Sequence, residues 1–316
     1  MTTKIGIVMD PIESIKTYKD SSFAMILAAQ KKGWEVHYMQ QRDLWLHGGR
    51  AYGRTQIISV VDQKTDFVTF HGEQELPLAE LDAILLRTDP PFDMEYVYTT
   101  YILERAEAEG TVIVNNPQAL RDANEKVYTA WFPETTPITL VTRDSGRIKK
   151  FLAEHKDIIV KPLDMMGGSS IFRLREGDAN INVTLEVMTE HDGRFIIAQR
   201  FIPEIVETGD KRILLINGDP VPYALARMLQ EGETRANMAV GGKPIGVPLT
   251  DRDRWICEQG GPALREKGLI FVGIDVIGDY MTEVNVTSPT GIRELENQFG
   301  LDISGQLMDV IAEKIG

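Results

Sequence analysis

The sequence has little cysteine, an excess of negative over positive charge and no long apolar run. Cys257 is the only cysteine of 316 residues, which excludes an internal disulfide framework and is typical of a reducing cytosol. Lys and Arg number 34 against 47 Asp and Glu, and the formal net charge of −13 argues against nucleic acid as a partner. No run approaches the length that spans a bilayer, and the run at 5–9 is too short for a signal-peptide core. We therefore expect a cytoplasmic protein without membrane or nucleic-acid partners.

Several common catalytic motifs are also absent. The sequence contains no G-x-x-x-x-G-K-[ST], which excludes a P-loop, and no G-x-G-x-x-G follows its first strand pattern. A G-x-S-x-G elbow is missing, and the five histidines lack metal-ligand spacing, which argues against zinc. The chemistry must therefore come from carboxylates, amides, lysines and arginines.

Strand and helix patterns alternate from the start of the chain. A strand at 5–9, a helix at 21–32 and a strand at 36–39 form a βαβ opening, which predicts a parallel sheet. Beyond about residue 123 strands outnumber helical crossovers, so the predicted fold class is α/β followed by α+β. We expect domain boundaries near residues 123 and 203. The other expected elements are a hairpin within 41–75, strands at 81–86, 111–114, 138–141, 158–163, 171–174, 195–202, 212–217, 222–229, 270–277 and 281–286, and helices at 94–109, 125–132, 145–155 and 251–267 with two more at the C-terminus.

The stretch EVNVTSPTG carries two oxygen-bearing side chains on one strand face. Glu283 and Asn285 are two residues apart, and positions i and i+2 of a strand point the same way. Hard cations such as Mg²⁺ favour such ligands, although taken alone this stretch is more typical of a polar strand face in water. Asp275 shares that face only if the connecting turn has an odd length or a bulge. We therefore predict a three-residue loop at 278–280 or a β-bulge.

Cations and glycines follow one another in the second half of the chain. Lys161 ends an apolar strand, and the turn after it could direct backbone N–H groups at an anion, with a simple Gly-Gly hairpin as the alternative. Lys126 is a second candidate cation, and its alternative is a surface lysine. Two further polar segments come later, at Gln199–Ile202 and at Asp210–Arg212.

The order of these motifs resembles the ATP-grasp superfamily. Lys126, KPLDMMGGSSIFR, AQRFI, GDKR and GIDVIGDYMTEVNVTSPTGIRE occur in sequence. MDPI, KDSSFAM, LLRTDPPFD and YILERAE near the N-terminus are similar, more closely, to the bacterial glutathione synthetase family. The resemblance covers essentially residues 1–316 and is weakest at about 41–75.

The resemblance implies an ATP-grasp fold with three units. These would be an N-terminal substrate-binding α/β domain at 1–122, a small central ATP-grasp subdomain at 123–202, and a C-terminal subdomain at 203–316 with a metal site and a lid at about 230–243. The implied reaction is the ATP-dependent ligation of γ-glutamylcysteine and glycine to glutathione, through an acyl phosphate. By family analogy the protein would be a homotetramer.

The resemblance also implies roles for individual residues. Arg212 and Arg227 would stabilise the transferring phosphoryl group and the tetrahedral oxyanion. Two Mg²⁺ ions, with Mn²⁺ as a substitute, would be held by Asp275, Glu283 and Asn285. The residues expected to bind ATP are Lys126, Lys161, Gly167, Gly168, Ser169, Ser170, Gln199, Arg200, Phe201, Ile202 and Asp210. The residues expected to bind the substrates are Asp20, Ser21, Arg87, Asp89, Arg235, Asn237, Thr287, Ser288 and Arg293.

Two alternative functions stay open at this point. One is a different ATP-grasp carboxylate–amine ligase, such as a D-alanine–D-alanine ligase or a ligase that adds glutamate to a peptide tail. The other is a nucleotide-binding regulatory protein without catalysis. The N-terminal motifs argue against the first, and the complete set of acidic, amide and arginine residues argues against the second.

Overall fold

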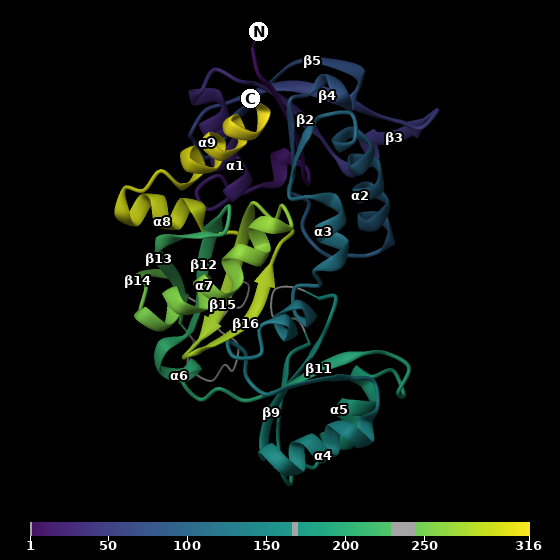
Figure 1. Ribbon diagram of the computed structural model, residues 1–316, viewed down its shortest axis with the longest axis vertical. Coiled ribbons are helices and arrows are strands. Elements are labelled where there is room, and N and C mark those ends of the chain that lie inside the picture. The colour runs from purple at the N-terminus through teal and green to yellow at the C-terminus, as the bar shows by residue number, and fades with distance from the viewer. Residues whose placement is uncertain (1, 166–169, 229–243) are drawn as a thin grey trace.

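The computed structural model describes residues 2–165, 170–228 and 244–316, which form three β-sheets covered by helices (Figure 1). The sheets fall within 4–114, 139–200 and 210–285, so the boundaries expected near 123 and 203 lie between consecutive sheets. As limits of domains they stay a prediction. Within the described residues, no helix combines the length and apolar character needed to cross a bilayer.

The first sheet is mixed rather than purely parallel. Four strands pair in parallel, as the βαβ pattern predicts, while the region at 44–77 adds three antiparallel strands to one edge. The added strands include the expected hairpin, and β5 is mostly exposed, whereas β1 and β6 are buried. The order is β3-β4-β2-β1-β6-β7, with β5 on β4. The strands are β1 (Lys4–Val8), β2 (Glu35–Met39), β3 (Leu44–His47), β4 (Arg50–Val60), β5 (Val68–Pro77), β6 (Ala83–Leu86) and β7 (Val112–Val114).

Helices of the first unit begin at well-formed caps. Asp20 accepts from the Phe23 N–H and begins α1 (Ser21–Lys31), and Asp93 does the same for Tyr96 in α2 (Met94–Glu107). Asn116 accepts from the Ala119 N–H and is followed by proline at the first position of α3 (Pro117–Asp122), where a missing N–H costs nothing. These caps place the loops after β6 and β7 at the carboxyl edge of the sheet.

The central sheet is antiparallel and has a core of its own. Its order is β10-β9-β11-β8, with the strands β8 (Thr139–Thr142), β9 (Asp157–Pro162), β10 (Phe172–Arg175) and β11 (Ile196–Arg200). Helices α4 (Ser145–His155) and α5 (Ile181–Met188) pack on it, and its buried cluster includes only residues of this unit. The sequence analysis missed α5. The helix expected at 125–132 is a short 3₁₀ helix, η4 (Val127–Trp131), because Pro133 disfavours helical geometry at the preceding residue.

The third sheet is antiparallel and shares its core with the first. Its order is β14-β13-β12-β15-β16, with the strands β12 (Asp210–Ile216), β13 (Asp219–Arg227), β14 (Pro244–Pro248), β15 (Phe271–Ile277) and β16 (Tyr280–Asn285). Its helices are α6 (Ile205–Thr208), α7 (Asp251–Glu266), α8 (Ile292–Phe299) and α9 (Ile303–Ile315). Cys257 is buried in α7.

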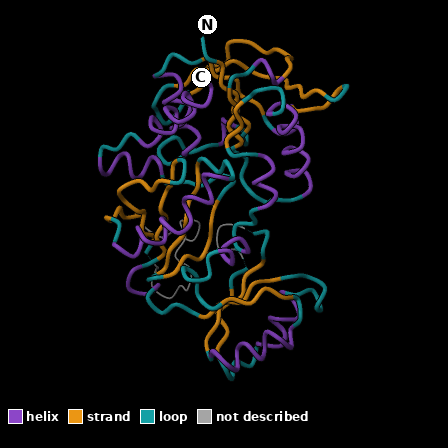
Figure 2. Tube along the Cα trace, viewed as in Figure 1, coloured by secondary structure: helices purple, strands orange, loops and turns teal. Residues whose placement is uncertain are grey.

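The C-terminal helices return to the N-terminal unit. Both α8 and α9 contact α1, and the two chain ends lie near each other at the top of Figure 1. One buried cluster joins Ile5 of β1, Leu214 of β12 and Leu307 of α9. The first and third sheets therefore form one packed body, while the central sheet projects below it (Figure 2).

Candidate functional site

Three charged residues lie in one row across the third sheet. Arg212 on β12 pairs with Asp275 on β15, which in turn pairs with Glu283 on β16. Ile277 pairs with Tyr280, so the loop holds only two residues, and the register then shifts between Asp275 and Val276. The predicted bulge is confirmed, and it is this bulge that brings Asp275 and Glu283 opposite each other on the same face.

Asp275 is held by two arginines. Arg212 donates from Nε and Nη2 to the two carboxylate oxygens at 2.6 and 2.8 Å, and Arg227 on β13 lies 2.9 Å from Oδ2. Burial alone would raise the pKa of Asp275, but the two guanidinium groups outweigh it and hold that pKa below its ordinary value. Burial would likewise lower the pKa of Arg227, whereas Asp210 and Asp275 raise it. Arg227 therefore stays charged inside the protein.

Asp210 has one oxygen paired and one without a partner. Arg227 donates to Oδ2 at 2.6 Å. Oδ1 is buried and meets no hydrogen-bond partner within the described part of the chain. Such an oxygen can accept a hydrogen bond from a hydroxyl group of a ligand, which is the role expected here toward a ribose. Burial raises the pKa of this carboxyl group to about 6, with Arg227 opposing the shift and Asp275 adding to it.

In the ligand-free protein, Asp210 makes the free energy of unfolding fall as pH rises from about 4 to about 6. Its pKa is about 6 in the fold and 3.8 as an ordinary aspartate, so in this window the unfolded chain binds fewer protons. Asp210→Asn removes the effect. The difference in free energy of unfolding between variant and wild type should change by about 2–3 kcal/mol over this range. Urea titrations from about pH 4 to 7 measure it, and a flat difference would contradict the assignment.

Two lysines converge on Glu283 from outside the third sheet. Lys126 Nζ and Lys161 Nζ lie 3.7 and 3.8 Å from Glu283 Oε1, and both lysines are buried. Lys126 also donates to the Met165 carbonyl oxygen at 2.7 Å, next to the glycine turn. Burial lowers the pKa of Lys161; Lys126 adds to this and Glu283 opposes it. Two desolvated cations beside one carboxylate leave net positive charge for an anionic ligand.

Gly273 makes room for the Arg212 side chain. It lies two residues before Asp275 on β15, and a Cβ atom there would meet Pro289 Cβ at 2.9 Å and Arg212 Cδ at 3.0 Å. These distances are too short for either neighbour to keep its place. Only glycine therefore allows this placement of Arg212.

Gly273→Ala should lower the free energy of unfolding by about 1–3 kcal/mol and reduce kcat. The added methyl group pushes the guanidinium of Arg212 away from Asp275. Gly72→Ala is the matched control, because a Cβ at that strand glycine meets nothing within 4 Å. Urea unfolding and initial rates measure both effects, and equal behaviour of the two variants would show that the close approach is unimportant.

The oxygen ligands expected for a divalent cation lie on adjacent positions of β15 and β16. Asn285 donates from Nδ2 to the Gly273 carbonyl oxygen at 3.2 Å, so its Oδ1 remains as an acceptor next to Glu283. Among the described residues, no group of three or more His, Cys, Asp or Glu side chains is placed to bind a metal by itself. A donor set of two carboxylates and one amide fits Mg²⁺ that keeps phosphate and water ligands.

The segment expected to bind adenine lies between the central and third sheets. The N–H groups of Arg200 and Phe201 donate to the carbonyl oxygens of Ile138 and Asp157, both at 3.0 Å, so these two donors are engaged within the protein. The Gln199 side chain is buried and donates to Thr139 Oγ1. Any pairing with adenine would then use the carbonyl groups of this segment or the Ile202 N–H.

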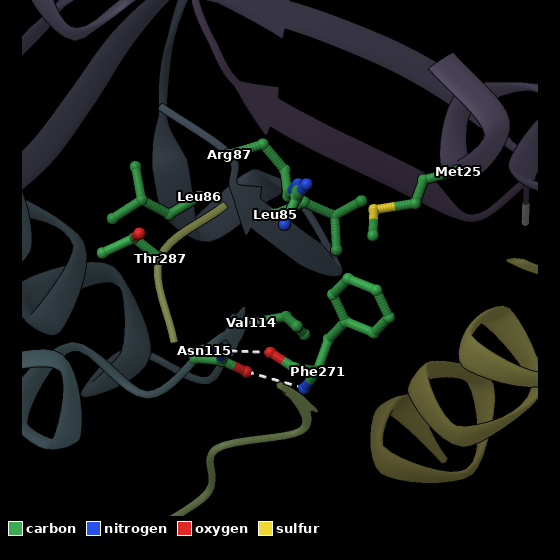
Figure 3. A pocket seen from close by; sticks show the side chains of 8 residues that line it. All are labelled: Met25, Leu85, Leu86, Arg87, Val114, Asn115, Phe271 and Thr287. Atoms are coloured by element: carbon green, nitrogen blue, oxygen red, sulfur yellow. Dashed lines mark hydrogen bonds between the residues drawn. The ribbon is translucent and has the colours of Figure 1, made fainter. Parts of the chain in front are cut away.

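Arg87 lies in the interface between the first and third sheets. Its Nε donates to Ser22 Oγ at 3.1 Å, its Nη2 donates to the Pro289 carbonyl oxygen at 2.9 Å, and its guanidinium lies 5.5 Å from the Phe271 ring centroid. It also borders a small cavity (Figure 3). Burial lowers its pKa, and Asp20 and Asp89 oppose this. Arg87 thus holds two sheets together as well as facing the predicted dipeptide site.

Polar groups around Arg87 are incompletely paired. Within the described part of the chain, the buried hydroxyl groups of Thr88 and Tyr96 have no hydrogen-bond partner. Burial raises the pKa of Asp89, which a hydrogen bond from Ser288 opposes. Such groups favour a polar ligand nearby. Sequence reasoning missed Thr88 and Tyr96, although the first stands between two predicted residues.

Three of the other residues expected to bind substrate make contacts within the protein. Asp20 caps α1, and Ser21 Oγ accepts from the N–H groups of Gly291 and Ile292, both at 3.2 Å. Arg293 pairs with Asp62, at 2.7 Å between Nη2 and Oδ1, away from the lysine cluster. Their binding roles stay predictions.

Thr287 and Ser288 follow Val286, just beyond the end of β16. Thr287 Oγ1 donates to Glu125 Oε1 at 2.9 Å, and Ser288 Oγ donates to the Arg87 carbonyl oxygen at 3.2 Å. The sequence analysis did not name Glu125 as a functional residue. Its position next to Lys126 was the signal that could have pointed to it. Five of the expected ligand residues lie outside the described residues, and a sixth lies directly beside them. Those outside are Gly167, Gly168, Ser169, Arg235 and Asn237, and the predicted lid at 230–243 also lies outside the described residues. Ser170 is the first described residue after 166–169.

Comparison with known proteins identifies the family. The description "Prokaryotic glutathione synthetase, N-terminal domain" matches residues 3–121, and "Prokaryotic glutathione synthetase, ATP-grasp domain" matches residues 125–300. The chain belongs to the prokaryotic glutathione synthetase family. Glutathione synthetase of Escherichia coli O127:H6 is 57% identical over 312 residues, covering 99% of this chain and 98% of that protein. That of Vibrio vulnificus strain YJ016 is 55% identical over 315 residues, covering 100% and 99%.

Solved structures agree with this fold. This glutathione synthetase family member is similar to D-cycloserine synthetase DcsG, with a TM-score of 0.71 and 13% identity over 99% of this chain and 100% of that chain. The ATP-grasp ligase PsnB, complexed with minimal precursor, Mg and ADP, has a TM-score of 0.63 and 17% identity over 98% of each chain. At such identities the likeness shows the fold alone. The predicted family, ATP-grasp fold and ATP-dependent ligase activity in glutathione synthesis are confirmed.

Proposed function

We propose that this chain joins the cysteinyl carboxylate of γ-glutamylcysteine to the amine of glycine, with ATP converted to ADP and phosphate. The observation that carries the proposal is the convergence of Lys126 and Lys161 on Glu283, beside the buried row of Arg212 and Asp275. Positive and negative groups meet there at a sheet junction, which suits the phosphate tail of a nucleotide and its metal ions. The family relationship favours glutathione formation over the other ATP-grasp ligations.

ATP would lie between the central and third sheets. Lys126 and Lys161 would contact its phosphates, helped by the turn at 167–170. Gln199–Ile202 would border the adenine, and Asp210 Oδ1 would accept a ribose hydroxyl. Support comes from the burial of both lysines and from the unpartnered buried oxygen of Asp210.

Asp275, Glu283 and Asn285 would hold the divalent cations, Mg²⁺ or Mn²⁺, that accompany ATP. When bound, these ions would neutralise phosphate charge and polarise the γ-phosphoryl group. The bulge in the β15–β16 hairpin supports the assignment, because it puts the two carboxylates opposite each other.

The protein side chains would act by position and charge rather than by covalent bonding. A carboxylate is a poor electrophile, so the γ-phosphoryl group first forms an acyl phosphate with it. The glycine amine then attacks and phosphate leaves. Arg212 and Arg227, paired with Asp275 and Asp210, would stabilise the negative charge that develops in both steps.

The N-terminal unit would recognise the dipeptide. Arg87 and Asp89 follow β6 at the carboxyl edge of the sheet, where ligands commonly meet parallel strands. Asp20 and Ser21 are weaker candidates for the dipeptide, while Thr287, Ser288 and Arg293 would hold the glycine carboxylate or the acceptor end. The expected domain limits, a cytoplasmic location and a homotetramer belong to the proposal on family analogy and are not carried by the site geometry.

The test of the proposed function is ADP release with Mg·ATP and γ-glutamylcysteine, measured with and without glycine. Turnover only with all three substrates, with a product of the mass of glutathione, is the expected result. Tight ATP binding without turnover would instead favour a regulatory nucleotide-binding protein. Turnover with D-alanine or with a glutamate-terminated peptide would favour another carboxylate–amine ligase.

A further inference from the structure

The segment that follows the metal strand is held by side chains from two other parts of the chain. Val286 comes directly after Asn285, the last residue of β16. Its N–H donates to Glu125 Oε1 at 3.0 Å, and its carbonyl oxygen accepts from Asn115 Nδ2 at 2.7 Å. Both backbone polar groups of Val286 are therefore bound by side chains rather than by a sheet partner.

Asn115 joins three strand ends at once. It follows β7, and its Nδ2 also donates to the Phe271 carbonyl oxygen at 2.8 Å, while its Oδ1 accepts from the Phe271 N–H at 2.9 Å (Figure 3). Phe271 is the first residue of β15. Asn115 is almost fully buried, so losing it leaves three backbone groups without partners. It therefore fixes the start of β15 and the end of β16 against the first sheet.

Glu125 holds the same segment from the other side. One oxygen, Oε1, accepts from the N–H groups of Val286 and Thr287 at 3.0 and 3.3 Å and from Thr287 Oγ1 at 2.9 Å. Its own carbonyl oxygen accepts from the Val284 N–H, between the two expected metal ligands of β16. Its neighbour Lys126 approaches Glu283. Glu125 thus connects β16, which carries Glu283 and Asn285, to Lys126 of the predicted phosphate site.

The segment also reaches Arg87. Arg87 Nη2 donates to the Pro289 carbonyl oxygen and the Arg87 carbonyl oxygen accepts from Ser288, so residues 286–289 connect β16 to the loop after β6. That loop and Asn115 leave neighbouring parallel strands at the same edge, since Leu85 pairs with Val114. The Asn115 and Glu125 contacts therefore lie on the direct path between the metal strand and the dipeptide loop.

We propose that Asn115 and Glu125 are positioning residues that fix Glu283 and Asn285 relative to Arg87. The inference rests on the proposed function for its metal ligands and dipeptide site. Neither residue touches substrate in this account; they act by binding the backbone of 284–287. Replacing groups that orient metal ligands commonly costs about 10- to 100-fold in metal affinity or activity. Loss of either residue should therefore weaken metal binding and raise the KM for γ-glutamylcysteine together.

The test compares Asn115→Ala with its neighbour Asn116→Ala. Asn116 also makes two side-chain hydrogen bonds, to Ala119 and Glu107, but contacts nothing in 284–289. Electron paramagnetic resonance follows Mn²⁺ binding to each full-length protein with a non-hydrolysable ATP analogue. We expect half-saturation by Mn²⁺ to shift about 10- to 100-fold for Asn115→Ala and less than about twofold for Asn116→Ala. If both variants lose a comparable amount of Tm and shift Mn²⁺ half-saturation equally, the inference is overturned. Asn115 would then be a structural cross-link only.

Glu125 supplies a second, independent comparison if Asn115→Ala does not fold. Glu125→Gln keeps an oxygen acceptor and should bind Mn²⁺ within about threefold of wild type, whereas Glu125→Ala should show the larger shift. If Glu125→Gln and Glu125→Ala lose Mn²⁺ affinity equally, the positioning role of the Glu125 side-chain oxygen is overturned. The titration requires no turnover. Wild type that binds Mn²⁺ but forms no glutathione would refute the proposed function alone, whereas wild type that binds no Mn²⁺ would refute this inference as well.

Discussion

Arg212→Ala should lower kcat about 100- to 1,000-fold while the protein stays folded. The guanidinium lies in register with Asp275 and Glu283 and is held in place by a bidentate pair with Asp275. Alanine removes the positive charge that, in the proposed function, would stabilise the transferring phosphoryl group. Arg227 still pairs with Asp275 in the variant, so that carboxylate keeps one cation. Initial rates at saturating ATP, γ-glutamylcysteine and glycine measure the effect.

Two variants make the Arg212 experiment specific. Arg212→Lys keeps the charge but cannot form the bidentate pair, so it should recover only part of the lost rate. Arg265→Ala removes an exposed arginine that pairs with Asp219, and it should leave kcat within about twofold of wild type because surface pairs contribute little. An Arg212→Ala protein with near-normal kcat would remove this residue from the proposed catalytic role.

Glu283→Gln should separate metal binding from nucleotide binding. The substitution removes a carboxylate ligand, so we expect Mn²⁺ affinity and kcat each to fall at least about 10- to 100-fold. It also removes the negative charge that lies 3.7 Å from Lys126 Nζ and 3.8 Å from Lys161 Nζ. Metal-free ATP should then bind as tightly as before or more tightly, because an anion has left the phosphate site. Titrations with and without metal measure the two effects.

The matched control is Glu313→Gln, on the exposed face of α9. It changes the net charge equally but lies far along the chain from β16, and it should leave both titrations unchanged. If Glu283→Gln weakens ATP binding equally with and without metal, the expected separation of metal binding from nucleotide binding is contradicted. That outcome would make Glu283 a partner of the lysines rather than a metal ligand.

Much of the fold was predictable because its periodic patterns are strong. The buried run at 5–9, the helix at 21–32 and the exact limits of α4 follow from apolar spacing and capping residues. The helix expected at 125–132 was wrong because Pro133 shortens it to a 3₁₀ turn. α5 was missed, since two of its valines, Val183 and Val187, are exposed and blur the apolar face. The three antiparallel strands at 44–77 depend on pairing between distant residues, which local patterns do not specify.

The candidate site was predictable in its charged residues but not in what holds them. Alternation along β16 placed Glu283 and Asn285 on one face. A three-residue loop or a bulge was predicted as the condition for Asp275 to share that face, and the structure has the bulge. Asn115 and Glu125 gave no comparable signal. Their role depends on contacts across 156 to 171 residues of sequence, which only the folded chain brings together.

The measurement that tests the account most directly follows oxygen from the substrate carboxylate. γ-Glutamylcysteine labelled with ¹⁸O in its cysteinyl carboxylate is turned over with Mg·ATP and glycine, and the phosphate released is analysed by mass spectrometry. An acyl phosphate requires one labelled oxygen to leave with each phosphate when the glycine amine displaces it. The account predicts one ¹⁸O in inorganic phosphate for each glutathione formed. Unlabelled phosphate, or label in AMP, would contradict it.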